Sequence, residues 1–322
     1  MAFGETVALL ANRLGSWSDG GVQILIAGAT GAIGLPIITQ LIDEGHDVVG
    51  LARDESGAAI LSELGAEAVV GNAMDPDSAA AAVRAAEPEV IIDQLTALPR
   101  HYTPEAMRAA LNVTVELRTI GGANLQAAAE VCGVSKYIVQ SSCYYYEPGD
   151  GLADESAPFA HNAPELVAKG VQAFESVEAR VLGSTRLTGV ALRYGFFYGP
   201  GTWYWPDNDI GHSVQGGLLP IVGDGQGVYS FVHVDDAADA TIIAATTDLS
   251  GAYNVTDDDP SPVSTWLPAF AHWVGGPAPR HVPAEGADPD AVFYNMQLRG
   301  ASNAAFKKLA DWQPRRLMWL ED

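Results

Sequence analysis

The chain has 322 residues, of which 48% are apolar and 18% are charged, and this composition excludes a disordered chain, a coiled coil and a collagen-like fibre. Lys and Arg total 17 against 40 Asp and Glu, which gives a formal net charge of −23. Because the sequence contains no basic cluster, we expect neither nucleic acid nor an anionic membrane as a partner.

Residues 1–20 resemble a short amphipathic helix followed by a Ser/Asp/Gly linker, and we interpret them as an N-terminal leader segment. They lack the basic start and long apolar stretch of a signal peptide, and no part of the chain has the roughly 18 apolar residues of a membrane span. Cys132 and Cys143 form neither a disulfide framework nor a metal-ligand spacing. We therefore expect a cytoplasmic protein with no metal site.

From residue 21 onward, short Val- and Ile-rich runs alternate with longer Ala-, Leu- and Glu-rich segments, which is typical of β-strands separated by helices. Strands are predicted at residues 22–27, 47–51, 68–70, 90–92, 137–140 and 189–193, and helices at 33–43, 78–86, 104–132 and 164–182. The strands are apolar throughout, so helices should cover both faces of the sheet. The predicted fold is α/β, a Rossmann-type doubly wound parallel sheet.

After residue 193 the chain becomes rich in Gly, Pro and aromatic residues for about 30 residues, which indicates an insertion that faces a substrate. The remaining predicted elements are strands at 228–232 and 252–255 and helices at 234–246, 263–273 and 302–310. We assign residues 21–193, completed by 228–256, to a dinucleotide-binding domain. Residues 194–227 and 257–322 are assigned to a smaller C-terminal substrate-binding lobe.

Three glycines lie three residues apart between the first strand and the first helix. Gly28 permits the tight turn, Gly31 leaves room for a pyrophosphate near the backbone, and Gly34 lets helix and strand pack closely. The helix N-terminus then supplies N–H groups to the phosphates. The residues expected to contact the cofactor here are Gly28, Thr30, Gly31, Ala32, Ile33 and Gly34.

The end of the second strand carries Ala52 and Arg53 where a carboxylate would normally hold the adenosine ribose. A small residue followed by a guanidinium suits a ribose 2′-phosphate, so we predict NADP as cofactor, with NAD as the alternative. Asp54 can still take the ribose hydroxyls, in which case Arg53 is a solvated loop charge. Asn72, with Ala73 beside it, is expected at the adenine edge, and simple turn chemistry is the other interpretation of Asn72.

Beyond the glycine loop, five segments resemble the extended short-chain dehydrogenase/reductase family, often labelled NAD-dependent epimerase/dehydratase. They are GVSKYIVQSSCYYY (133–146), LRYGFFYGPGT (192–202), PIVGDGQG (220–227), FVHVDDAADA (231–240) and GAYNVTDDDPSP (251–262). With the glycine loop they span roughly residues 22–275. The resemblance implies a homodimer built from the long helices 104–132 and 164–182. It also implies a nicotinamide site contacted by Leu95, Thr96, Ser141, Tyr194 and Phe196.

The resemblance assigns a catalytic serine to Ser142. The family's Tyr-x-x-x-Lys pair has no clean match, because the helix 164–182 contains Lys169 but no tyrosine. Lys169 is either the retained lysine or a surface residue. Since an alkoxide left by hydride transfer needs a proton, Tyr144 is our candidate donor, with Tyr194 as a weaker one.

Relatives that act on sugar nucleotides usually carry an arginine just before the FVHVDD segment, and here the stretch 227–230 has no cation. A diphosphate would be poorly bound without one. Tyr194, Trp203, Tyr204 and Trp205 are therefore expected to line a hydrophobic substrate pocket or a lid over it. Asp235 or Asp236 is predicted to cap a helix, with His233 structural, and the acidic run 257–259 is predicted to form a turn.

These observations predict an NAD(P)(H)-dependent oxidoreductase that transfers hydride between nicotinamide and a carbonyl or alcohol of a small, fairly apolar metabolite. Two alternatives stay open: a sugar-nucleotide epimerase or dehydratase, and a cofactor-binding module that has lost catalysis.

Overall fold

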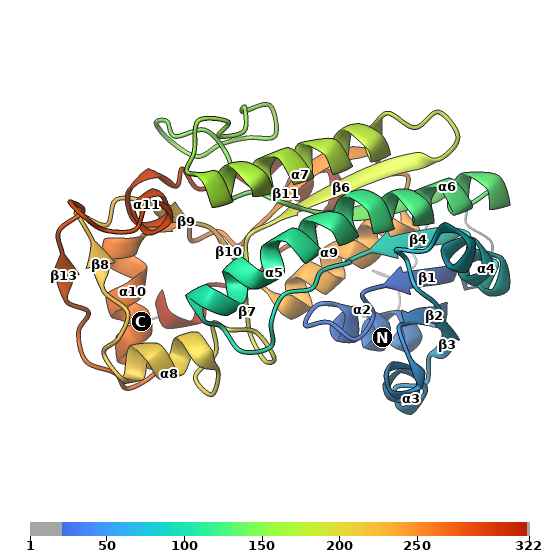
Figure 1. Cartoon of the computed structure of the whole chain (residues 1–322), viewed down its shortest axis with the longest axis horizontal. Coiled ribbons are helices and arrows are strands. Elements are labelled where there is room, and N and C mark those ends of the chain that lie inside the picture. Colours follow the sequence, from blue (N-terminus) through green and yellow to red (C-terminus); the bar gives the residue numbers. More distant parts are fainter. Residues whose placement is uncertain (1–20, 321–322) are drawn as a thin grey trace, which may run out of the picture.

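The computed structural model describes residues 21–320, so the predicted leader 1–20 lies outside the described residues. Seven parallel strands form the central sheet, in the order β11-β6-β5-β4-β1-β2-β3 (Figure 1). They are β1 (Gln23–Ala27), β2 (Asp47–Ala52), β3 (Glu67–Val70), β4 (Val90–Asp93), β5 (Lys136–Ser142), β6 (Thr188–Tyr194) and β11 (Gly251–Val255). The predicted Rossmann-type doubly wound sheet is confirmed.

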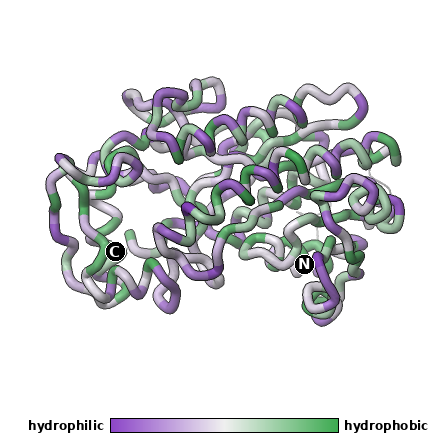
Figure 2. The backbone as a smooth tube through the Cα atoms, viewed as in Figure 1, coloured by the Kyte–Doolittle hydropathy of each residue, from purple (hydrophilic) through white to green (hydrophobic). Residues whose placement is uncertain are grey.

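Successive strand residues point to opposite faces of the sheet, and each face has its own core. Ile24 and Ile26 pack with α2 and α9 on one face, whereas Leu25 and Ala27 pack with α4, α6 and α7 on the other. The helices are α2 (Gly34–Asp43), α3 (Glu55–Glu63), α4 (Pro76–Ala86), α5 (Pro104–Glu116), α6 (Gly122–Cys132), α7 (Glu165–Leu182) and α9 (Val234–Thr246). Figure 2 shows the apolar stretches on the central strands and hydrophilic residues on the outer turns. Within residues 21–320, no helix is both long and apolar enough to cross a bilayer.

The long predicted helix 104–132 is continuous but not uniform. Between α5 and α6, residues Leu117–Gly121 form a single π turn, η1. Gly122, directly after this turn, packs tightly against the sheet, because a Cβ on it would lie 2.7 Å from Oδ2 of Asp93 on β4. The π turn therefore brings the helix against the sheet at this point. It is an element that the sequence pattern did not predict.

The C-terminal lobe packs around an aromatic core at the other end of the molecule, on the left in Figure 1. Its elements are β7 (Phe196–Tyr198), α8 (Asp209–Gln215), β8 (Ile221–Val222), β9 (Val228–Tyr229), β10 (Phe231–His233), β12 (Ser261–Pro262), α10 (Val263–Trp273), β13 (His281–Val282), α11 (Pro289–Val292), η2 (Phe293–Gln297) and η3 (Met318–Leu320). The remaining helix, α12 (Ala304–Ala310), packs against β11, and its Phe306 belongs to the core of the sheet domain. The single strand predicted at 228–232 is wrong. The chain breaks at Ser230, so that β9 pairs with β12 and β10 pairs with β7.

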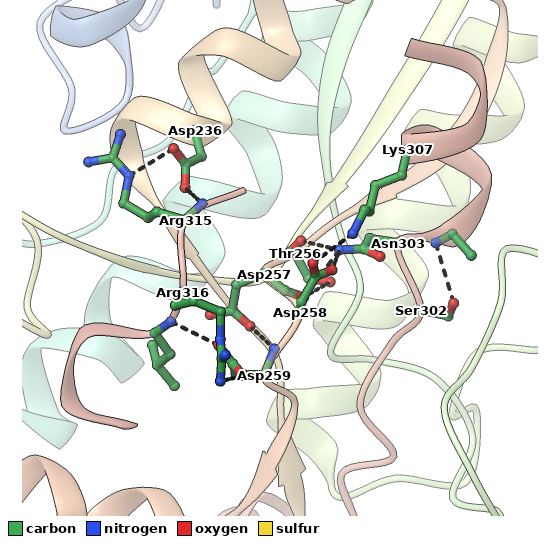
Figure 3. Close-up of polar contacts among 12 residues, drawn as sticks. Asp236, Thr256, Asp257, Asp258, Asp259, Ser302, Asn303, Lys307, Arg315 and Arg316 are labelled. Carbon is green, nitrogen blue, oxygen red and sulfur yellow. Dashed lines mark hydrogen bonds and ion pairs between the residues drawn. The ribbon is translucent and has the colours of Figure 1, made fainter. Parts of the chain in front are cut away.

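Acidic residues attach the C-terminal segment to the sheet domain (Figure 3). Asp236 accepts hydrogen bonds from the backbone N–H and Nε of Arg315, both at 2.8 Å. Asp259 binds Arg316 through two bonds of 2.7 Å, and Asp258 binds Lys307 at 2.6 Å. Asp258 and Asp259 thus pair with cations of the same chain, whereas Asp257 is buried and forms the turn by accepting the Asp259 N–H at 3.0 Å.

The cap of α9 differs from the prediction. Nδ1 of His233 accepts the Asp235 N–H at 3.2 Å, so His233 caps the helix and neither aspartate does. The reason is the extended backbone of His233, which turns its ring back over the first turn of the helix. Asp235 and Asp236 lie in that first turn, where the helix dipole favours negative charge.

A buried ion pair joins α7 to the end of the sheet. Nε of Arg193 on β6 donates to Oε1 of Glu178 at 2.8 Å, and Nη2 donates to Oε2 at 2.5 Å. Nη1 of Arg193 reaches the Tyr146 hydroxyl at 2.8 Å, and Ser141 Oγ donates to Glu178 Oε1 at 2.5 Å. Burial lowers the pKa of Arg193, but the hydrogen bonds and charge of Glu178 outweigh it and raise the pKa.

We predict that Glu178→Gln lowers the free energy of unfolding by about 3–5 kcal/mol, because it leaves the Arg193 charge buried without a counter-ion. The matched control on the same helix is Glu175→Gln, which breaks an exposed pair with His161 and should cost less than about 1 kcal/mol. Urea denaturation at 25 °C measures both. Equal losses for the two variants would contradict the role of the buried pair.

Candidate active site

The glycine loop lies where the strand order reverses. From β1 the sheet extends through β2 and β3 in one direction and through β4, β5 and β6 in the other. Gly28 has φ +81°, and a Cβ on it would lie 2.4 Å from the Gln94 carbonyl oxygen after β4. The loops after β1 and β4 therefore approach closely at the sheet's carboxyl edge, the place where doubly wound folds bind nucleotides.

The N-terminus of α2 is open for an anion. No side chain caps it, and its first turn contains no acidic residue. Thr30, Gly31 and Ala32 are exposed, whereas Ile33 and Gly34 are buried. A Cβ on Gly34 would lie 2.5 Å from the carbonyl oxygens of both Gly28 and Ala29. The turn thus combines a helix N-terminus that no side chain caps with close packing, which fits a pyrophosphate.

At the adenosine end of the expected site, Arg53 is exposed just after β2, whereas the carboxylate of Asp54 accepts hydrogen bonds from its own loop. Asp54 caps α3 by accepting from Gly57 N at 2.9 Å and from Ser56 Oγ at 2.6 Å, and these two hydrogen bonds lower the pKa of its carboxyl. Asn72 forms a turn, with Oδ1 accepting from the Met74 N–H at 3.0 Å. Ala73 beside it is buried.

The loop after β5 holds Ser142 and Tyr144 together. Ser142 is buried, and its Oγ accepts the Tyr144 N–H at 3.3 Å. Burial raises the pKa of Tyr144, while the charge of Arg118 and a side-chain hydrogen bond with Ser142 act to lower it. Ser141 is turned away, toward Glu178. The serine and phenol predicted for catalysis are therefore neighbours in contact.

Lys169 lies on the outer face of α7. Its Nζ pairs with Glu165 one turn earlier at 2.9 Å, and the two side chains are 43% and 81% exposed. Lys169 is therefore found as a surface residue, one of the two interpretations that the sequence allowed.

Three further residues predicted to contact the nicotinamide lie at the carboxyl ends of β4 and β6. Leu95 and Thr96 are half-buried behind β4. Tyr194 is fully buried, with its hydroxyl 2.7 Å from Thr241 Oγ1 and accepting from Gln94 Nε2 at 3.2 Å. Both contacts of its hydroxyl are with side chains of the protein interior, and burial raises the pKa of this phenol above its ordinary value.

Aromatic rings surround Tyr144 and form what we call the aromatic wall: Tyr144, Tyr145, Phe196, Tyr204, Tyr229 and Tyr294. Phe196 is its centre, with its ring stacked on Tyr144 at 4.3 Å and on Tyr229 at 4.4 Å. Tyr204 meets Phe196 edge-on at 6.1 Å. Both stacking contacts of Phe196 are made within the wall, which is thus a packed apolar cluster that includes Tyr144 of the Ser142 loop.

The two tryptophans predicted for the pocket lie at the edge of the lobe. Trp203 packs edge-on against Tyr102 at 5.2 Å, and Trp205 packs against Trp273 at 5.5 Å. Tyr102 belongs to the loop between β4 and α5, and its N–H donates to Asp209 on α8 at 2.7 Å. These contacts tie the lobe to the nucleotide-binding domain beside the site.

Arg118, on the π turn η1, is a residue that the sequence analysis missed. Its guanidinium carbon lies 4.2 Å from the ring centre of Phe174 on α7. Burial lowers the pKa of Arg118, whereas the nearby Tyr144, Tyr145 and Asp93 act to raise it. The sequence did contain one indication of its place. Arg118 lies four positions after the buried Thr114 and four positions before Gly122, so the three residues share the inner face of the helix.

Residues 24–256 match the NAD dependent epimerase/dehydratase family. The chain belongs to this family. Its cofactor is accordingly a nicotinamide dinucleotide, and its members are oxidoreductases, epimerases and dehydratases. Together with the open helix N-terminus and the crowded glycine turn, this assignment confirms the predicted enzyme class.

Two relatives of this chain are named as reductases. The 3-diazoavenalumate denitrifying reductase of Streptomyces sp. is 40% identical over 307 residues, covering 92% of this chain and 98% of the relative. The 2-alkyl-3-oxoalkanoate reductase of Stenotrophomonas maltophilia is 24% identical over 270 residues, covering 80% and 77%. Among solved structures, the UDP-glucose 4-epimerase of Thermus thermophilus with NAD has a TM-score of 0.68 and 25% identity, covering 92% and 95%.

The glycine loop yields a paired prediction. Gly31→Ala should leave the free energy of unfolding within about 1 kcal/mol but weaken NADPH binding at least about tenfold, because the methyl occupies the exposed phosphate approach. Gly34→Ala should cost about 1–3 kcal/mol of stability through its backbone clash. Fluorescence titration and urea denaturation separate the two effects. Normal NADPH affinity in a folded Gly31→Ala variant would contradict the predicted site.

Proposed function

We propose that this chain is an NADPH-dependent reductase that acts on a small aromatic substrate, with a diazonium carbon as hydride acceptor. The observation that carries the proposal is the aromatic wall, which places stacked rings beside Ser142 and Tyr144. The nicotinamide supplies the hydride when bound. The wall excludes water and holds the substrate ring, and Ser142 orients it.

The name of the Streptomyces relative, a denitrifying reductase of a diazo compound, supports this acceptor. Addition of hydride to an aryl diazonium carbon breaks the C–N bond and releases N2, so no alkoxide forms and no proton has to be donated at that step. Such a site does not need a Tyr–Lys pair. The exposed position of Lys169, which pairs with Glu165, agrees with a site that works without this pair.

A carbonyl is the second candidate acceptor, favoured by the contact between Ser142 and Tyr144. In this reaction Ser142 donates a hydrogen bond to the substrate oxygen and Tyr144 supplies the proton to the developing alkoxide. Burial raises the pKa of Tyr144, and the charge of Arg118 and the hydrogen bond with Ser142 act in the opposite direction.

The sugar-nucleotide alternative has less support. Ser230, in the stretch where such relatives carry an arginine, is 2% exposed, and its Oγ accepts the Ala301 N–H at 2.9 Å. This position therefore offers a diphosphate no cation. The remaining alternative, a cofactor-binding module that has lost catalysis, predicts cofactor binding without turnover of any acceptor.

Turnover by a Tyr144→Phe variant distinguishes the acceptors. We expect NADPH-dependent N2 release from an aryl diazonium to change less than about threefold, since no proton donor is used, and ketone reduction to fall about 10²–10⁴-fold. Gas analysis and NADPH absorbance measure the two reactions. Conversion of a UDP-sugar without net NADPH consumption would instead favour the epimerase, and inactivity with every acceptor would favour the degenerate module.

We also propose that Arg53 selects NADPH over NADH by pairing with the ribose 2′-phosphate. NADPH should bind about tenfold more tightly than NADH, a difference near 1.4 kcal/mol, and Arg53→Ala should remove this preference. Arg84→Ala on α4 is the control, because Arg84 is also exposed. Tighter binding of NADH than of NADPH by the unmodified protein would contradict the proposed role of Arg53.

A homodimer through α5, α6 and α7 is a further part of the proposal. Val113, Ile120 and Val131 are 49%, 48% and 79% exposed on the run from α5 to α6, which lies beside α7 in Figure 1. Apolar side chains of this kind favour burial in a partner interface. We expect Val113→Glu with Ile120→Glu to halve the mass in sedimentation equilibrium, while Leu218→Glu in the lobe leaves it unchanged. A monomeric unmodified chain would contradict the dimer.

Finally, we propose a cytoplasmic location. Both cysteines are free thiols, with Cys132 exposed and Cys143 buried. A reducing compartment maintains an exposed thiol in this state.

A further inference from the structure

Arg118 is a partly buried cation with no carboxylate in contact within the described part of the chain, residues 21–320. Asp93, the carboxylate whose charge acts on the pKa of Arg118, accepts hydrogen bonds from the Tyr137 hydroxyl at 2.7 Å and the Leu95 N–H at 3.1 Å. One guanidinium nitrogen, Nη2, approaches Gln140 Oε1 at 3.5 Å. The positive charge of Arg118 is therefore not neutralised by an ion pair among these residues.

The guanidinium retains hydrogen-bonding capacity. Its Nε is buried and has no hydrogen-bond partner among residues 21–320, while its face is covered by the Phe174 ring at 4.2 Å. A buried donor without a partner costs free energy, and so does an unpaired buried charge. The planar fork of a guanidinium, with one face stacked and its Nε unpaired, matches a carboxylate.

Arg118 also adjoins the aromatic wall. Phe174, on which it stacks, packs against Tyr145 at 5.8 Å, and Tyr145 meets Tyr144 edge-on at 4.8 Å. The charge of Arg118 acts on the phenols of both tyrosines. An apolar aromatic surface with a single unpaired cation at its border suits a ligand with the complementary pattern, an aromatic ring and one negative charge.

The backbone holds Arg118 in this place. A Cβ on Gly122 would lie 2.7 Å from Asp93 Oδ2, so only glycine lets the helix approach β4 so closely. The π turn η1 ends at Gly121, directly before this contact. π turns within α-helices occur frequently at functional sites. The position of Arg118 is thus set by main-chain packing as well as by its own contacts.

We propose that Arg118 binds the carboxylate of the substrate, which is accordingly an aromatic or conjugated carboxylic acid whose ring lies against Tyr144 and Phe196. This inference rests on the proposed function, since it assumes that the aromatic wall holds the substrate. The names of both reductase relatives denote carboxylates, an avenalumate and an oxoalkanoate. Arg118 acts as a specificity residue that selects the acid over its neutral analogues.

The test is the binding of cinnamate and cinnamamide to the full chain saturated with NADP+, measured by isothermal titration calorimetry. These probes differ in charge but not in ring or chain length, and neither is reduced. The unmodified protein should bind cinnamate more tightly than cinnamamide. Arg118→Gln should weaken cinnamate binding about 10–100-fold, as expected for the loss of charge-assisted hydrogen bonds, and leave cinnamamide unchanged. Arg118→Lys should retain part of the preference.

Arg108→Gln, on the exposed face of α5, is the matched control and should change neither affinity. The NADPH affinity of Arg118→Gln should equal that of the unmodified protein, and its thermal unfolding temperature should be no lower, because the substitution removes an unpaired buried charge. Equal weakening of cinnamate, cinnamamide and NADPH would overturn the assignment, because Arg118 would then hold the cofactor or the fold.

Failure of this inference is distinguishable from failure of the proposed function. If the unmodified protein binds both probes and Arg118→Gln changes neither, the carboxylate assignment is wrong and the aromatic substrate site stands. If NADPH binds but neither probe does, both the aromatic substrate and the Arg118 assignment are wrong.

Discussion

The buried pairing of Glu178 with Arg193 connects three elements whose relative position decides the site. Glu178 belongs to α7 and Arg193 to β6, and the same carboxylate accepts the Ser141 hydroxyl at the end of β5. Arg193 also reaches Tyr146, so that residues 141–146, which include Ser142 and Tyr144, are held at both of their ends. Because a buried charge without its partner is costly, the loop is held at both of its ends by one ion pair.

This arrangement explains why the site has an aromatic rather than a basic character. The cation that might have faced the substrate from α7, Lys169, lies in an exposed pair with Glu165. Next to it on the helix, Gly170 accommodates the Tyr145 ring, since a Cβ there would lie 2.8 Å from that ring. The face of α7 turned toward the site thus receives an aromatic side chain. The positive charge comes instead from Arg118 on η1.

The high net negative charge has a structural use at the other end of the site. Asp236, Asp258 and Asp259 each pair with a basic side chain from the C-terminal segment, namely Arg315, Lys307 and Arg316. These bonds attach the end of the chain to α9 and to the turn after β11 (Figure 3). Acidic residues that the sequence placed at a helix start and in a turn therefore also bind the protein's own C-terminal segment.

The sequence by itself determined the doubly wound sheet, the glycine turn at its centre and the aromatic composition of the pocket, and from these the family and the cofactor class. Such features depend on residues close together in the chain, where hydrophobic period and the steric demands of glycine act directly. The tertiary structure decided which of the chemically capable side chains meet. Arg118 and Tyr144 come from separate elements, Lys169 is turned outward by the packing of α7, and His233 replaces the aspartates as a cap through its backbone angle. Spacing within one segment indicates at most which helix face a residue shares, as for Arg118, whereas the contacts that its side chain makes with other segments are properties of packing.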